Sequence, residues 1–158
     1  MVNDFSIIEQ IKLVKEKKEK LSRIEQNLSS PILTDKSLIP EIYELFKRVL
    51  SEQDFSPMPE SPHQRKKFVF VILFLYSPKT LAGYHSPRGL RDAIAKAIGL
   101  RDVTFISNNI ETVAFLSQND KYFKEDIEYL YTEIITRLKI KGLITVSYTH
   151  LRAHETEA

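Results

Sequence analysis

Apolar residues recur every seven positions near the N-terminus. The repeat consists of Ile7, Val14, Leu21 and Leu28, and it is widened into a stripe by Ile8, Ile11 and Ile24. This spacing predicts one long helix over residues 4–28 with a coiled-coil-like seam. Lys18 and Glu25 interrupt the second seam position, so the pattern is short and imperfect. Two uses of the helix follow: contact in a homodimer through residues 4–28, or packing onto its own domain.

Helical spacing continues along the chain and is interrupted by prolines. Pro31 ends the first helix because proline lacks a backbone donor and biases its predecessor toward extended geometry, whereas Pro40 suits the first turn of the next helix. The run 68–76 is apolar throughout, and periodicity alone does not separate a buried strand from a buried helix. We expect a helix, because a single strand would have no partner. The predicted helices cover residues 41–51, 63–76, 87–98, 102–117 and 121–141.

The predicted fold class is therefore all-α. We expect a compact bundle of about six helices in a domain at 38–144, preceded by a helical arm at 1–30. The nine-residue apolar run is far shorter than the roughly 20 residues that span a bilayer. The chain start alternates apolar and charged residues and lacks the apolar core of a signal peptide. A cytoplasmic location without membrane contact is the resulting expectation.

The last residues form a separate case. Residues 146–156 read VSYTHLRAHET, which resembles the translation of a transposase-based sequencing adapter in one reading frame. We therefore expect residues 145–158 to be a non-native tail and exclude them from fold reasoning, as one does for a tag. The natural protein would then continue past Ile144. His150 and His154 are spaced like a pair of metal ligands on a helix, but as part of such a tail they would not indicate a metal site.

Composition excludes several classes of function. The 158 residues include no cysteine and 4 glycines, and the net charge is +2. Without cysteine there is no thiol nucleophile, disulfide or thiolate metal site, and few glycines leave little material for a phosphate-binding loop. His63 and His85 lack a neighbouring acid-and-nucleophile pattern. We expect no catalytic residues, no metal site and no cofactor, and hence a protein that is not an enzyme.

One segment carries a functional pattern. Ala95 is small enough to let two helices cross closely, Gly99 tolerates a left-handed turn, and Leu100 can fill the corner behind it. The following helix would have an apolar inner face made of Val103, Ile106, Ile110 and Val113. This arrangement, at about residues 87–117, resembles the helix-turn-helix of DNA-binding proteins.

The resemblance implies that the second helix lies in the major groove of DNA. The outer-face side chains that would approach base edges are Thr104, Ser107, Asn108 and Glu111. Ile106 comes seven residues after Gly99, whereas the motif ordinarily places its first buried residue six after the glycine. Either the turn is one residue longer, or Phe105 takes the inward position.

Basic residues surround this segment. Between Arg65 and Arg101 the chain has eight basic residues and one acidic residue, Asp92. Such an excess suits contact with phosphates around a recognition helix. The candidates are Arg65, Lys66, Lys67, Lys79, Arg88, Arg91 and Arg101. Residues 119–133 are acidic instead, which reconciles a local DNA-binding surface with a low net charge. The expected partner is double-stranded DNA, and the expected role is transcription or replication control.

Two other interpretations stay open. In the first, the corner is purely structural and its basic residues form a solvated surface. In the second, the chain is a protein–protein interaction module that uses the arm and an exposed face of the apolar helix 68–76. The block HQRKKFVFVILFLYSPKTLAG, followed by the corner and by KEDIEYLYTEI, is also similar to uncharacterised small proteins of bacterial phages and mobile elements. That similarity implies a bacterial or phage setting and no mechanism.

Overall fold

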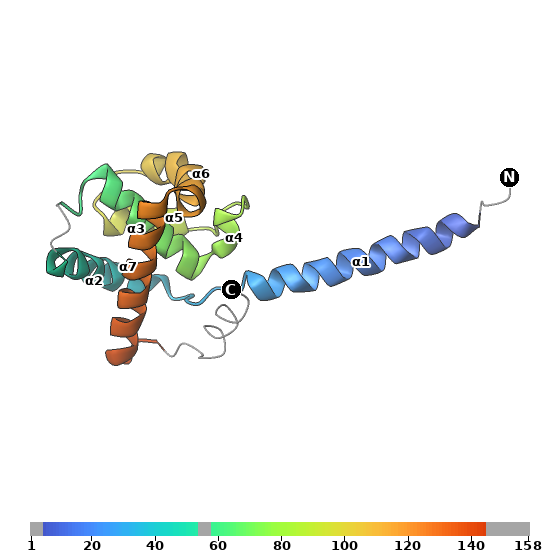
Figure 1. Ribbon diagram of the computed structural model, residues 1–158, viewed down its shortest axis with the longest axis horizontal. Helices are drawn as coiled ribbons and strands as arrows, with labels where there is room; N and C mark the ends of the chain where they lie inside the picture. Colours follow the sequence, from blue (N-terminus) through green and yellow to red (C-terminus); the bar gives the residue numbers. More distant parts are fainter. Residues whose placement is uncertain (1–4, 54–57, 145–158) are drawn as a thin grey trace. The chain divides into compact units, whose positions relative to one another are not determined.

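The computed structural model describes residues 5–53 and 58–144. The described residues are helical with no strand, which confirms the all-α prediction (Figure 1). They form seven α-helices where about six were expected, the extra one being the short α4, Pro78–Leu81. The chain divides into two units between Ser30 and Pro31. The predicted non-native tail lies outside the described residues.

The first unit is the single helix α1, Ser6–Leu28, which has no buried residue. Two serine hydroxyls end it by bonding to carbonyls of its last turn: Ser29 Oγ donates to Glu25 O at 2.6 Å and Ser30 Oγ to Gln26 O at 3.2 Å. Serine competes in this way with continued helix. The apolar stripe therefore stays exposed, because a single helix cannot bury its own side chains.

The second unit is a helical bundle. Its elements after residue 30 are the 3₁₀ turn η1 (Lys36–Leu38), α2 (Ile39–Glu52), α3 (Pro62–Tyr76), α4, α5 (Leu90–Ala97), α6 (Thr104–Asn119) and α7 (Lys121–Ile140). Helix α3 packs against α2, α4, α6 and α7 and is the central element of this unit. The core therefore lies around α3, with α6 packed beside it, and α5 packs against α2 and α6.

The apolar run of α3 is a helix buried nearly all round. Ser61 begins the helix, because its Oγ accepts a bond from Gln64 N at 3.3 Å, and Pro62 follows in the first turn. Seven of the nine apolar residues are buried: Phe68, Val69, Val71, Ile72, Leu73, Leu75 and Tyr76. Phe70 and Phe74 are half-buried. Little of this helix is therefore open to a protein partner.

The chain that precedes α2 also belongs to the bundle, although the expected domain began only at residue 38. The backbone N–H groups of Ile32 and Leu33 both donate to Leu75 O, at 2.9 and 3.0 Å. Tyr76 Oη donates to Asp35 O at 2.7 Å. These three bonds fasten residues 32–35 to the last turn of α3.

Candidate nucleic-acid interface

Helices α5 and α6, which flank the corner, both begin later than the sequence predicted. Helix α5 begins at Leu90 instead of residue 87, because Gly89 has a φ of 86°, a left-handed geometry that a helix cannot contain. Helix α6 begins at Thr104 instead of residue 102, because Asp102 Oδ1 accepts the Thr104 N–H at 2.9 Å. Hydrogen bonds from the Thr104 backbone and side chain lower the pKa of the Asp102 carboxyl.

The residues predicted for the motif core lie at this corner. Ala95 and Ile106 are buried, while Leu100 and Ile110 are half-buried. Gly99 has a φ of 77°, and the next N–H, that of Leu100, donates to Ala95 O at 2.8 Å. Ile106 is fully buried and Phe105 only half-buried. Of the two alternatives for the spacing, the longer turn is the one found.

Replacing Gly99 by Ala is expected to destabilise the protein by about 1–2 kcal/mol, because a Cβ is strained at a left-handed φ. The strain would be purely local, since no atom lies within 4 Å of an added Cβ. Gly99→Asn should cost less, because asparagine tolerates this geometry. Chemical denaturation measures both. A stability gain in Gly99→Ala, as is usual where φ is negative, would contradict the left-handed turn.

The outer face of α6 is open. It consists of the four residues predicted to read bases, Thr104, Ser107, Asn108 and Glu111, all of which are exposed. Ile106 and Val113, on the inner side of the same helix, are fully buried. The inner side of α6 therefore anchors the helix in the bundle, and the outer face is free to meet a partner.

A direct contact joins one predicted phosphate ligand to this face. Arg91 Nη1 donates to Ser107 Oγ at 2.6 Å, which links the start of α5 to α6. Both residues line a groove of about 540 Å³, whose other wall is the segment after α4, including Tyr84, His85 and Ser86. Glu111 lines the same groove. The site thus combines a guanidinium, a carboxylate and short hydroxyls on one surface.

Four more cations lie just before α5, in the α5–α6 turn or beside the groove. Arg88 and Arg101 are exposed, and Lys36 Nζ donates to Arg88 O at 3.0 Å. Sequence reasoning missed Lys36, because it is 52 positions away from Arg88 and belongs to no local motif. Lys79 is half-buried, with its Nζ 4.5 Å from the centre of the Tyr84 ring.

The basic start of α3 is used within the fold. Lys67 is only 3% exposed, and its Nζ lies 2.7 Å from Asp126 Oδ2 on α7. The phosphate role predicted for Lys67 does not fit this position, because its charge is paired inside the protein. Arg65 is half-buried and its Nη2 donates to Ile98 O at 3.5 Å, at the end of α5. Lys66 is half-buried as well. Counting charges along the chain could not reveal these partners.

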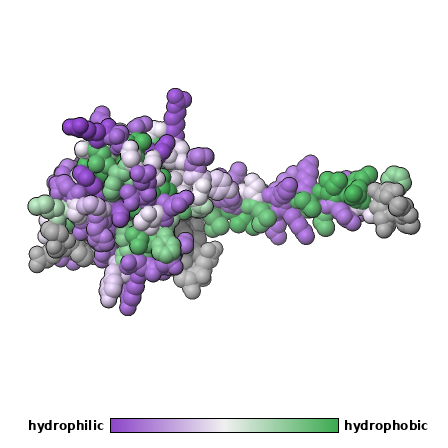
Figure 2. Space-filling model, turned by 90° about the horizontal axis from the view of Figure 1, so that it is seen from above, coloured by the Kyte–Doolittle hydropathy of each residue, from purple (hydrophilic) through white to green (hydrophobic). Residues whose placement is uncertain are grey.

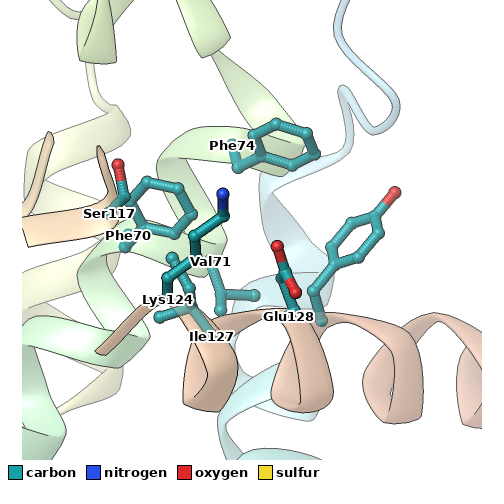
Figure 3. Close-up of a pocket in the computed structure, with 8 residues that line it drawn as sticks. Phe70, Val71, Phe74, Ser117, Lys124, Ile127 and Glu128 are labelled. Atoms are coloured by element: carbon teal, nitrogen blue, oxygen red, sulfur yellow. The ribbon is translucent and has the colours of Figure 1, made fainter. Parts of the chain in front are cut away.

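A second concavity lies between α3 and α7, and Ser117 near the end of α6 also lines it. It has a volume of about 290 Å³ and an apolar lining that includes Phe70, Phe74 and Tyr131. Figure 3 shows Lys124 and Glu128 of α7 facing the same space as the two phenylalanines. The Phe74 and Tyr131 rings meet edge to face with centroids 5.2 Å apart, and burial raises the pKa of Tyr131. This pocket offers packing surface and no arranged nucleophile.

Other chemistry finds no arranged site in the part of the chain that the structure describes. Within residues 5–53 and 58–144, no group of three or more His, Asp or Glu side chains is placed to hold a metal ion. No helix in those ranges is long and apolar enough to cross a bilayer. The α5–α6 corner therefore stays the best-formed candidate site. Comparisons with protein families, curated proteins and solved structures found no match for this chain.

Proposed function

We propose that this protein binds double-stranded DNA through the α5–α6 corner, with the outer face of α6 in the major groove. Its role would be transcription or replication control in a bacterium, phage or mobile element. The observation that carries the proposal is the Arg91–Ser107 contact, which holds a cation beside an exposed polar helix face. Guanidinium groups suit phosphates, and short polar side chains suit base edges.

The side chains divide into two roles. Lys36, Arg88, Arg91 and Arg101 neutralise phosphates, because they surround the corner and three of them are exposed arginines. Asn108 and Glu111 read bases, since asparagine pairs with the adenine edge and glutamate accepts from cytosine. Ser107 is engaged by Arg91 and so helps to orient that arginine. Four phosphate contacts correspond to a log–log salt slope of roughly −3 to −4.

Charge reversal at Arg91 and Arg101 is expected to weaken binding to every duplex by at least about tenfold at low salt and to reduce the salt slope by about 2. Fluorescence anisotropy with a mixed-sequence duplex measures both. Arg48→Glu on α2 is a single charge reversal on a helix that does not belong to the corner, and it should leave the slope unchanged. A wild-type affinity weaker than about 100 µM at low salt, the weak end of nonspecific binding, would refute the proposal.

Replacing Asn108 by Ala is expected to relax sequence preference while changing nonspecific affinity little. A good bidentate contact to a base contributes about 1–3 kcal/mol of discrimination. Selection from a random duplex library, followed by binding to selected and scrambled sites, measures this difference. Equal loss on both sites would place Asn108 on the backbone instead of on a base.

A second candidate function is protein–protein association through α1. The observation that favours it is the row of exposed apolar residues on that helix, which has no buried residue. The partner would be another protein or a second copy of this chain, since the seven-residue apolar repeat in residues 4–28 is typical of paired helices. The apolar face of α3 adds little to this candidate, since only Phe70 and Phe74 are partly open.

A further inference from the structure

The seam of α1 is an exposed apolar surface. Seven aliphatic residues of the stripe are between 45% and 64% exposed: Ile7, Ile8, Ile11, Val14, Leu21, Ile24 and Leu28. Single apolar residues on a surface are ordinary, but apolar residues that repeat along one face of a helix mark an interaction site. An isolated helix also gains little stability in water, because most helical stability comes from packing an amphipathic face.

From this row we infer that α1 pairs with α1 of a second copy of this chain, in antiparallel orientation. The inference names the partner for the second candidate function, on which it rests, and it is independent of DNA binding. A repeat of seven residues is the pattern of a helix that packs along another helix. A second copy supplies a seam of the same length and spacing.

The charged seam positions select the orientation. One series of seam residues is aliphatic throughout, and the other contains Ile11, Lys18 and Glu25. In a parallel pair in register, each seam residue faces its own copy, so Lys18 would face Lys18 and Glu25 would face Glu25. In an antiparallel pair the two series face each other, so both charged residues lie opposite aliphatic side chains. The long lysine stem can then cover apolar surface while its ammonium reaches water.

The distribution of side chains along α1 agrees with this orientation. Figure 2 shows hydrophobic side chains toward both ends of the helix and hydrophilic side chains between them. The central stretch 15–20 reads KEKKEK. Antiparallel pairing lays the apolar N-terminal stretch of one copy on the apolar C-terminal stretch of the other. Glu25 then also lies nearer the partner's helix N-terminus, where the helix dipole favours a negative charge.

The test is sedimentation equilibrium of the full chain over a wide range of protein concentration. We expect a monomer–dimer equilibrium, and Leu21→Asp should raise the dissociation constant at least about 100-fold, because each copy would bury a carboxylate in place of an aliphatic side chain. Gln26→Asp adds the same charge outside the seam and should leave the constant nearly unchanged. A chain that is monomeric at every concentration, or a dimer that Leu21→Asp does not weaken, would overturn the inference.

The orientation of the two α1 helices is measured as the distance between spin labels, one on each chain. Because the chain has no cysteine, a single introduced cysteine places the label at one chosen position. In dimers labelled at Gln10→Cys, an antiparallel pair separates the two sites by about 18 Å or more along the axis at 1.5 Å per residue. A parallel pair places them about 10 Å apart, the distance between packed helix axes. The shorter distance would overturn the orientation. The DNA affinity of Leu21→Asp, measured with a single-site duplex, keeps the two proposals separable. If this variant is monomeric and still binds DNA, the proposed DNA binding through the α5–α6 corner stands whatever the outcome for the dimer.

Discussion

Replacing Asp126 by Leu is expected to destabilise the protein by about 3 kcal/mol, because removing one member of a buried ion pair costs the other member a close opposite charge in a medium of low polarity. The charge left behind is the Lys67 ammonium, which is 3% exposed and lies 2.7 Å from the Asp126 carboxylate. Asp126 itself keeps part of its side chain in water, with 27% exposed. The effect should therefore fall at the lower end of the range for such pairs.

The double variant Lys67→Met/Asp126→Leu distinguishes the cost of losing one member of the pair from the net contribution of the whole pair to stability. It should recover most of the lost stability, since a buried pair replaced by apolar side chains of similar volume is often neutral or better. Glu125→Leu, at the exposed neighbouring position on α7, is the control and should change little. Denaturant titrations of the four proteins measure the difference. If the double variant were as unstable as Asp126→Leu alone, the pair would have to position α3 against α7 directly.

Replacing Phe68 by Ala is expected to cost about 3–5 kcal/mol, the range for removing a buried aromatic side chain. Phe68 is fully buried near the middle of the central helix, α3. Its ring lies 5.0 Å from that of Tyr43 and 5.2 Å from that of Phe46, both on α2. The substitution removes apolar burial, leaves a cavity and breaks both aromatic contacts between α2 and α3.

Phe115→Ala is the matched control. It makes the same chemical change on α6, at a side chain that is 62% exposed, and it should stay within about 0.5 kcal/mol of the parent. Thermal unfolding followed by circular dichroism measures both variants. A loss at Phe115 comparable to that at Phe68 would mean that the exposed ring of α6 contributes to a surface that is covered in solution.

Periodicity and proline placement predicted most of the fold. The long helices were expected within a few residues of their observed ends, because an apolar stripe of helical spacing is a local signal, and so are the prolines at the junctions before α2, α3, α4 and α5. Boundaries shifted where a backbone angle or a cap decided them, as at Gly89 and Asp102. The short helix α4 was not predicted, because four residues are too few to show an apolar stripe of helical spacing.

The candidate site was less predictable, because its electrostatics depend on residues far apart in the chain. Lys67 looks like part of a basic cluster until Asp126, 59 positions later, is brought against it. Lys36 contributes to the corner through the Arg88 carbonyl, a contact that no motif describes. The exposed outer face of α6, by contrast, follows from helical spacing alone. The sequence pattern therefore indicated which face of α6 could bind a partner. The tertiary contacts determined which charged side chains lie near that face.

The attachment of residues 32–35 to α3 has a mechanical consequence. Leu75 O receives the N–H groups of Ile32 and Leu33, directly after the residue at which the bundle begins. A pull exerted through α1 would therefore load the final turn of the central helix first, before any peripheral segment could stretch. Tension on the arm and integrity of the core are linked through two neighbouring groups of α3, the Leu75 carbonyl and the Tyr76 hydroxyl.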